Sequence, residues 1–311
     1  MLKNVIILTC LALLASCNAK QSVNPATSQE SNGSIDAGDE TYTFADSTER
    51  VRFSVTATMP LTTDAASMLI RESLTKVLDE ELSHIEYDPR LFAPYKGKDK
   101  SLKAILDYYG SHAFAEYQNL AENDYNERKE YLSNDSTLSD KERQQRIKDT
   151  PQWEHTSTIS KEYDGEKYVV YLHQTYTYMG GAHGGVGGEG SITFNRSTGT
   201  RITRFFTADA QKGMQRLIKE GLKGYFSEYD NKVTTDEELM GQLLLEGNTI
   251  PLPAQAPYLS NNGLVLTYQQ YEIAPYAAGM PNFTIPYEDA MPYLTDEIKE
   301  LLFTKRYILF R

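Results

Sequence analysis

A glycine-rich stretch that follows two tyrosines holds residue types suited to contacting a ligand through the backbone. Residues 176–185 read YTYMGGAHGG, and seven glycines fall between Gly180 and Gly190. Glycine permits positive φ angles and close approach, so such a loop can present backbone amides to a bound group. No Gly-Lys-Ser/Thr follows as in a P-loop, and the strand expected next excludes a dinucleotide fingerprint, which opens a helix. A ligand-binding loop and a tight structural connection between strands both stay open.

Histidine is the next side chain that could do chemistry, and His183 lies inside this loop. The other four histidines show no H-x-x-x-H or H-E-x-x-H spacing; they are His84, His112, His155 and His173. A metal site normally needs three or four ligands, so we predict no metal site and no cofactor. No G-x-S-x-G motif accompanies His183. We therefore expect it to be a hydrogen-bonded residue of the loop.

A second stretch, residues 271–281, reads YEIAPYAAGMP. Aromatic rings around Pro and Gly can form a platform for a sugar ring or an extended peptide, or they can pack a bent sheet edge. Glu189, Glu272 and Asp289 are three carboxylates of this half of the chain that could act as acid or base. Glycoside hydrolysis requires two converging carboxylic acids, and nothing in the spacing of these three indicates that any two converge. We assign no catalytic residue.

Hydrophobic patterns predict the elements that position these segments. Val51 to Ala57 alternates as a strand, and Thr63 or Asp64 is expected to cap a helix that runs to about residue 84. A longer helix is expected over 101–132. From Pro151 on, hairpin signals dominate, with strands over 153–163, 167–178 and 191–195 and helices over 210–229, 237–245 and 288–302. This order predicts an α+β fold, with hairpin-rich antiparallel sheets packed with helices in two modules, residues 45–150 and 151–311.

The first residues are typical of a bacterial lipoprotein signal. Lys3 precedes an apolar run over 5–14, which is too short to cross a hydrocarbon core that takes roughly 20 helical residues. Leu14-Ala15-Ser16-Cys17 resembles a lipobox, which predicts a signal peptide over 1–16 and an acylated, palmitate-type Cys17. A plain signal peptide with an inert Cys17 is the alternative. Residues 17–44, rich in Ser, Asn, Gly and acids, predict a flexible tether.

The net charge of the chain indicates which classes of partner it can bind. The 311 residues include 31 Lys and Arg against 43 Asp and Glu, for a net charge of −12. Such an acidic chain is unsuited to nucleic acid, whose phosphates need clustered Lys and Arg, and it attracts basic partners. Two cysteines are too few for a multi-disulfide scaffold or a four-thiolate zinc site.

The glycine-rich and aromatic motifs together resemble one family, the envelope domain shared by RsiV-type anti-sigma factors and the N-terminal region of PdaC-type peptidoglycan deacetylases. The resemblance covers roughly 150–300, and its matching residues are Tyr176, Tyr178, Gly180 to Gly184, Asn195, Thr198, Gly199, Ile202, Tyr271 to Gly279, Pro281 and Ile285 to Tyr287. Residues 45–150 resemble the smaller module that precedes this domain. RsiV-type proteins bind lysozyme with it, whereas PdaC-type enzymes deacetylate through a separate metal-dependent domain. The Asp-Asp and H-x-x-x-H ligand pattern of that domain does not occur in this sequence, so the deacetylase activity is not carried over.

We therefore expect the non-catalytic, ligand-binding head of a cell-envelope lipoprotein, held at a membrane by Cys17. Asn18, rather than Asp, follows the cysteine, which favours the outer membrane. The resemblance implies a lysozyme-like protein or peptidoglycan glycan as the ligand, contacted by Tyr176, Tyr178, Gly180, Gly181, His183, Gly184, Tyr271, Glu272 and Tyr276. One alternative is an enzyme or accessory factor acting on cell-wall glycan, with Glu272, Asp289 or His183 as acid or base. A structural envelope lipoprotein is the other.

Overall fold

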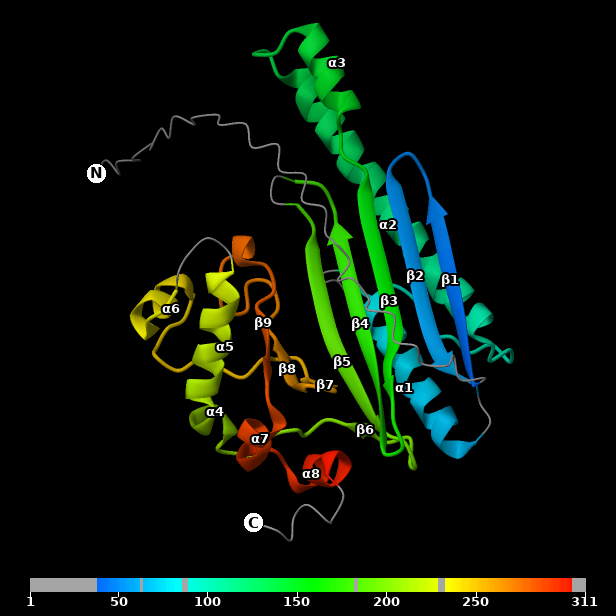
Figure 1. The fold of residues 1–311 in the computed structure, drawn as a ribbon. Helices are drawn as coiled ribbons and strands as arrows, with labels where there is room; N and C mark the ends of the chain where they lie inside the picture. The colour runs from blue at the N-terminus through cyan, green and yellow to red at the C-terminus, as the bar shows by residue number, and fades with distance from the viewer. Residues whose placement is uncertain (1–37, 62–63, 86–88, 182–183, 229–232, 304–311) are drawn as a thin grey trace, which may run out of the picture. The chain divides into compact units, whose positions relative to one another are not determined.

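The computed structural model describes residues 38–61, 64–85, 89–181, 184–228 and 233–303. Its centre is a six-stranded sheet in the order β1-β2-β3-β4-β5-β6 (Figure 1). All neighbouring strands pair antiparallel except β2 and β3, which are parallel. The predicted α+β class is confirmed. The strands are β1 (Asp39–Ser47), β2 (Val51–Pro60), β3 (Trp153–Asp164), β4 (Tyr168–Tyr178), β5 (Val186–Asn195) and β6 (Arg201–Ile202).

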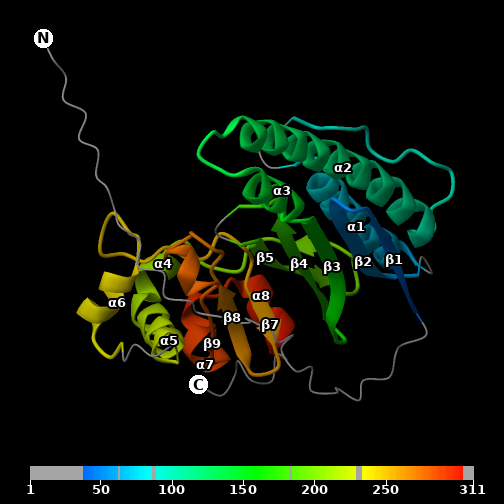
Figure 2. The same ribbon diagram turned by 90° about the horizontal axis from the view of Figure 1, so that it is seen from above.

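Three helices form the long crossover that a parallel pair such as β2 and β3 requires. They are α1 (Ala65–Leu82), α2 (Leu102–Asn134) and α3 (Asp140–Lys148). The caps follow the sequence: the Asp64 carboxylate accepts a hydrogen bond from the Ser67 amide at 2.8 Å, and Ser139 forms a capping box with Glu142. Figures 1 and 2 show α1 and α2 on one face of the sheet, with the far end of α2 and α3 extending beyond it.

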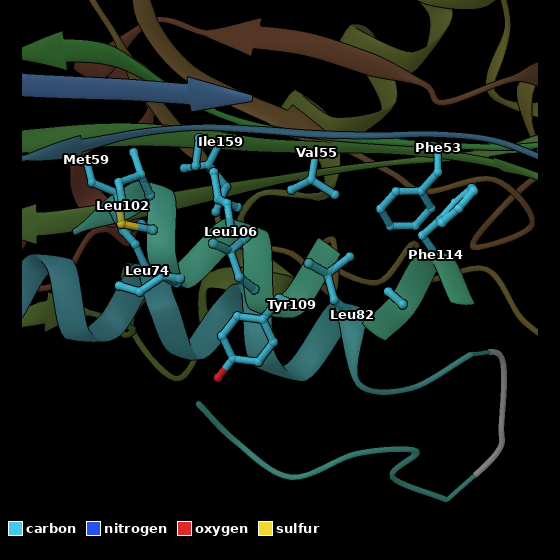
Figure 3. Close-up of a cluster of buried hydrophobic side chains, with 14 of the residues drawn as sticks. Phe53, Val55, Met59, Leu74, Leu82, Leu102, Leu106, Tyr109, Phe114 and Ile159 are labelled. Atoms are coloured by element: carbon cyan, nitrogen blue, oxygen red, sulfur yellow. The ribbon is translucent and has the colours of Figure 1, made fainter. Parts of the chain in front are cut away.

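A hydrophobic core fills the space between α1, α2 and the sheet (Figure 3). Alternate residues of β2, among them Phe53 and Val55, point into it. Leu74 and Leu78 of α1 and Leu106 of α2 meet them from the helix side. Residues three or four apart share one helix face, which is why the apolar spacing seen in the sequence produces a continuous buried stripe. Each such side chain contributes about 1.5–3 kcal/mol when fully buried.

The first four residues of β4 are buried on both faces and separate two cores. Val169 and Tyr171 point into the first core, whereas Tyr168 and Val170 point into a second core on the opposite face. Figure 2 shows the C-terminal elements that form this second core on the far side of the sheet from α1 and α2. Both cores consist of residues within the compact unit Gly38–Arg311, so this unit carries its own core and can fold without the first 37 residues.

The C-terminal elements include a second, three-stranded antiparallel sheet in the order β7-β8-β9. Its strands are β7 (Tyr258–Ser260), β8 (Gly263–Thr267) and β9 (Asn282–Ile285). The helices are α4 (Ala210–Gly213), α5 (Gln215–Ser227), α6 (Asp236–Gln242), α7 (Tyr287–Ala290) and α8 (Asp296–Leu302), with 3-10 turns at η1 (Tyr276–Ala278) and η2 (Met291–Tyr293). The terminal helix predicted over 288–302 is divided because Pro292 lies in η2 and supplies no backbone N–H.

The start of the folded unit also differs from the prediction. The tether expected over 17–44 was predicted to end too late in the sequence, because the residues from Asp39 onward already form β1 and pair with β2. Tyr42 and Phe44 pack against the first core, and Thr41 on the other face bonds the hydroxyl of Thr58 at 2.9 Å. The domain boundary expected at residue 150 is wrong. It would divide one sheet, because β2 before this residue pairs with β3 after it. Within the described ranges, no helix combines the length and apolar character needed to cross a membrane.

Candidate functional site

The glycine-rich segment and the 271–281 segment lie against each other at the start of β5. The Tyr276 hydroxyl donates a hydrogen bond to the Gly185 carbonyl at 2.6 Å. A Cβ at Gly184 would come within 3.1 Å of the same hydroxyl oxygen, so the absence of a side chain permits this approach. The structure therefore joins two segments that the sequence singled out separately. We call the surface formed by residues 184–187 and 271–280 the loop surface.

Two glutamine side chains stabilise this contact by forming hydrogen bonds with the backbone of β5, as a neighbouring strand would do. The Gln270 carbonyl oxygen accepts from the Gly187 amide at 2.8 Å. Gln269 accepts from the Glu189 amide at 2.9 Å and donates to its carbonyl at 2.8 Å. β6 pairs with β5 only near Phe194, so these amides satisfy backbone groups that a bare edge would leave open.

Tyrosines of both segments gather at the loop surface. A Cβ on Gly185 would lie 2.3 Å from the Tyr176 ring, so only glycine fits beside it. Burial and the nearby charge of Glu154 raise the pKa of the Tyr176 phenol, and Tyr276 adds to this effect. The Tyr271 ring lies 5.8 Å from the Tyr276 ring, and the side chain of Tyr271 is exposed. Tyr271 also has a φ of 65°, which is strained for a residue with a side chain.

The turn between β4 and β5 depends on glycine for its backbone shape. Gly180, Gly181 and Gly184 have φ angles of 81°, 109° and 81°. The Tyr178 hydroxyl donates to the Gly181 carbonyl at 3.3 Å. The predicted residues His183 and Cys17 lie outside the described residues.

The carboxylates that the sequence singled out have separate surroundings. The two oxygens of Glu272 accept hydrogen bonds from the Ala254 and Gln269 amides, each at 2.7 Å. Glu189 accepts from the Gln174 side-chain amide at 2.9 Å. Asp289 lies in α7, and within the described residues no hydrogen bond joins it to Glu189 or Glu272. Glu272 therefore braces the loop surface, and among the described residues these three acids are not joined as a converging pair.

A polar cluster that the sequence interpretation missed lies on the opposite face of the sheet, centred on Glu81 at the end of α1. One oxygen of Glu81 accepts from the Ser157 hydroxyl at 2.8 Å and lies 2.7 Å from His173 Nε2. The other oxygen lies 3.4 Å from His155 Nε2. Burial by itself raises the pKa of Glu81, but the close approach of His155 and the hydrogen bond with His173 outweigh it and lower the pKa to about 2.

This cluster borders a pocket of about 540 Å³. Its lining combines apolar and polar side chains, namely Glu81, His84, Ile85, Tyr117, His155, Thr175, Thr177, Met179 and Val186, with Gly187. Ser157 and Glu81 both contact the same nitrogen of His173, at 3.3 and 2.7 Å. A nucleophile–base–acid relay needs them on opposite nitrogens, so the cluster is not a hydrolytic triad. No three His, Cys, Asp or Glu of the described residues are arranged to hold a metal ion.

One signal in the sequence points toward this cluster. Trp153, His155, Ser157 and Ile159 alternate on the buried face of β3. A histidine and a serine at core-facing positions indicate buried polar partners, because unpaired polar groups are costly inside a protein. The partners themselves come from α1 and β4, so no local spacing identifies them.

Comparison with known proteins shows similarity to one family. Residues 203–288 match the protein family of unknown function DUF3298, a range that includes the 271–281 segment but not the glycine-rich segment. The fold is similar to the crystal structure of a DUF3298 member from Bacteroides fragilis NCTC 9343, with a TM-score of 0.60, 18% identity and coverage of 86% of this chain and 97% of that one. A DUF3298 protein from Pseudomonas aeruginosa PAO1 gives a TM-score of 0.49, 14% identity and coverage of 83% and 95%. No curated protein is significantly similar in sequence.

Proposed function

We propose that this chain is a cell-envelope lipoprotein, anchored through acylated Cys17, whose head binds another envelope molecule at the loop surface without catalysing a reaction. One observation carries the proposal. The Tyr276 hydroxyl donates a hydrogen bond to the backbone of Gly185, so two distant segments hold each other in place while the Tyr271 side chain stays exposed. The lipobox-like end of the first 17 residues supports the anchor, and Asn18 after Cys17 favours an outer-membrane location.

The chemistry of the loop surface suits binding. Tyrosine supplies a large, stiff contact area at a low entropic cost, and glycine allows a partner to approach the backbone. Ordering losses on association are small when the surface is already held by hydrogen bonds, as Gln269 and Gln270 hold it here. The strained backbone of Tyr271 is typical of a residue whose position serves a site.

A basic, lysozyme-like protein is the ligand that we favour. The net charge of −12 accelerates encounter with a strongly basic partner. The resemblance of the tyrosine and glycine motifs to RsiV-type domains, which bind lysozyme, supports the same ligand class.

Cell-wall glycan is the second candidate, favoured by the exposed Tyr271 ring beside Tyr276, on which a sugar face can stack. Catalysis on that glycan is less well supported. Both oxygens of Glu272 already accept backbone amides, which leaves this carboxylate poorly placed to donate or accept a proton from a substrate.

Calorimetric titration of the head with hen lysozyme at low salt tests the proposal. We expect saturable binding that Tyr271→Ala weakens by about 2 kcal/mol, or roughly 30-fold, as for a central aromatic contact. Tyr131→Ala is the matched control, because Tyr131 of α2 is an exposed tyrosine outside the loop surface, and it should bind as the wild type does.

Other results separate the alternatives. Heat with muropeptides but not with lysozyme would assign the loop surface to glycan. The absence of heat with either ligand would contradict a binding role. Turnover of a wall polymer that one substitution abolishes would replace binding by catalysis.

A further inference from the structure

The described chain enters the fold beside the start of α1. The Leu61 amide at the end of β2 donates to the Gly38 carbonyl at 2.6 Å. Glu40, near the start of β1, pairs with buried Arg71 of α1 at 2.5 Å. Figure 1 shows the beginnings of β1 and α1 at the same end of the sheet. The chain that follows the proposed anchor at Cys17 therefore joins the head at this end.

Exposed apolar side chains gather at that same end. Among the described residues, seven large hydrophobic side chains are exposed, and three of them are Leu61 (38%), Met68 (50%) and Leu69 (48%). Met68 and Leu69 lie in the first two turns of α1, whose opposite side packs into the first core. Met68 also lines a pocket of about 370 Å³ together with Tyr95, Lys100 and Ile105. Clustered exposed apolar residues mark a surface that meets a partner or a membrane.

A lysine-rich loop borders this apolar cluster. Lys96, Lys98 and Lys100 are all exposed, and the Lys100 carbonyl accepts from Arg71 of α1 at 3.0 Å. Asp99 is the one carboxylate between them, and it accepts the Ser101 amide at 2.8 Å. Glu72 of α1 lines the same pocket, and the Asp64 carboxylate caps the start of α1 by accepting the Ser67 amide. In a chain with a net charge of −12, three lysines within five residues form a distinct basic patch.

We propose that this end of the head, formed by Leu61, Met68, Leu69, Lys96, Lys98 and Lys100, rests on an anionic lipid surface. The lysines meet the headgroups while the aliphatic side chains enter the boundary between headgroups and acyl chains. The acidity of the whole chain repels such a surface, so only a locally basic and apolar end can approach it. The head is thereby oriented, and a weak contact supplements the anchor. This inference goes beyond the proposed function, and it concerns residues outside the loop surface.

Vesicle sedimentation of residues 38–311, which carry both cores, tests the contact without the anchor. The probes are vesicles of phosphatidylglycerol and phosphatidylcholine in equal amounts, and vesicles of phosphatidylcholine alone. We expect partitioning onto the anionic vesicles only. Each lysine near the surface is worth about fivefold in partitioning, so Lys96→Gln with Lys98→Gln should reduce it about 25-fold. Met68→Gln with Leu69→Gln should reduce it about tenfold.

Matched controls keep the test specific. Lys141 and Lys148 are exposed lysines of α3, at the opposite end of the molecule in Figure 1, and replacing both by Gln should leave partitioning unchanged. Leu244→Gln is the apolar control. No partitioning onto either vesicle would overturn the inference, as would equal losses in the test and control variants. Because the assay contains no lysozyme and no acyl chain, its failure leaves the binding and anchoring proposals standing.

Discussion

Replacing Glu81 by glutamine removes one negative charge while keeping the shape of the side chain. In the wild type the Glu81 carboxylate accepts a hydrogen bond from the Ser157 hydroxyl and contacts His173 and His155. A pKa lowered from 4.5 to about 2 corresponds to about 3 kcal/mol in favour of the folded state. The side chain is only 14% exposed, so solvent screens little of this energy. We expect Glu81→Gln to lower the free energy of unfolding by about 3 kcal/mol at pH 7.

The pH dependence gives a second signature of the same charge. Because the pKa of Glu81 is lower in the folded than in the unfolded chain, its contribution is complete above pH 4.5 and is lost as the pH falls toward about 2. The difference in unfolding free energy between the wild type and the variant should shrink in this window. Other carboxylates titrate in both proteins and cancel in the difference.

Urea denaturation followed by tryptophan fluorescence measures these energies. Trp153 is the single tryptophan of the chain and is buried on β3, two residues from His155. Glu80→Gln is the control, because Glu80 forms only a surface pair with Lys76 at 3.5 Å, worth no more than about 0.5 kcal/mol. A loss below about 1 kcal/mol for Glu81→Gln at pH 7, or a difference that does not change between pH 4.5 and about 2, would refute the reasoning.

Three further outcomes are expected. Gly199→Ala should lower the unfolding free energy by about 3 kcal/mol in urea, because Gly199 has a φ of 68° and its Cβ would lie 2.3 Å from the Ala66 carbonyl oxygen; wild-type stability would contradict this. Tyr276→Phe should cost about 1 kcal/mol and speed amide exchange over 184–187, since the ring stays and the bond to Gly185 is lost; unchanged exchange would count against that bond. Cys17→Ala should abolish palmitate labelling and move the protein from the membrane to the soluble fraction, and continued sedimentation with membranes would refute the anchor.

The parts of the fold that depend on local patterns could be predicted from the sequence. The alternation in β2, the cap at Asp64 and the capping box at Ser139 each involve residues within a few positions of one another. Successive apolar residues such as Val169 and Val170 in β4 are typical of a strand that is buried on two faces, and these two side chains enter different cores.

Contacts between distant segments could not be predicted. β2 and β3 pair in parallel although Val51 and its partner Trp153 are separated by three helices. The Gln269 side chain forms hydrogen bonds with the backbone at the edge of β5. Such contacts produce no periodic pattern in a sequence. The charge of Glu81 is likewise explained only by residues from β3 and β4. In each case tertiary packing, not propensity, decides which groups meet.

Hydrogen–deuterium exchange of the intact acylated protein, with and without lysozyme, tests most directly whether the loop surface is a docking surface. We predict slower exchange confined to residues 184–187 and 271–280, with the Tyr271→Ala variant showing none of it. Unchanged exchange at both segments in the presence of saturating lysozyme and of muropeptides would contradict the central claim.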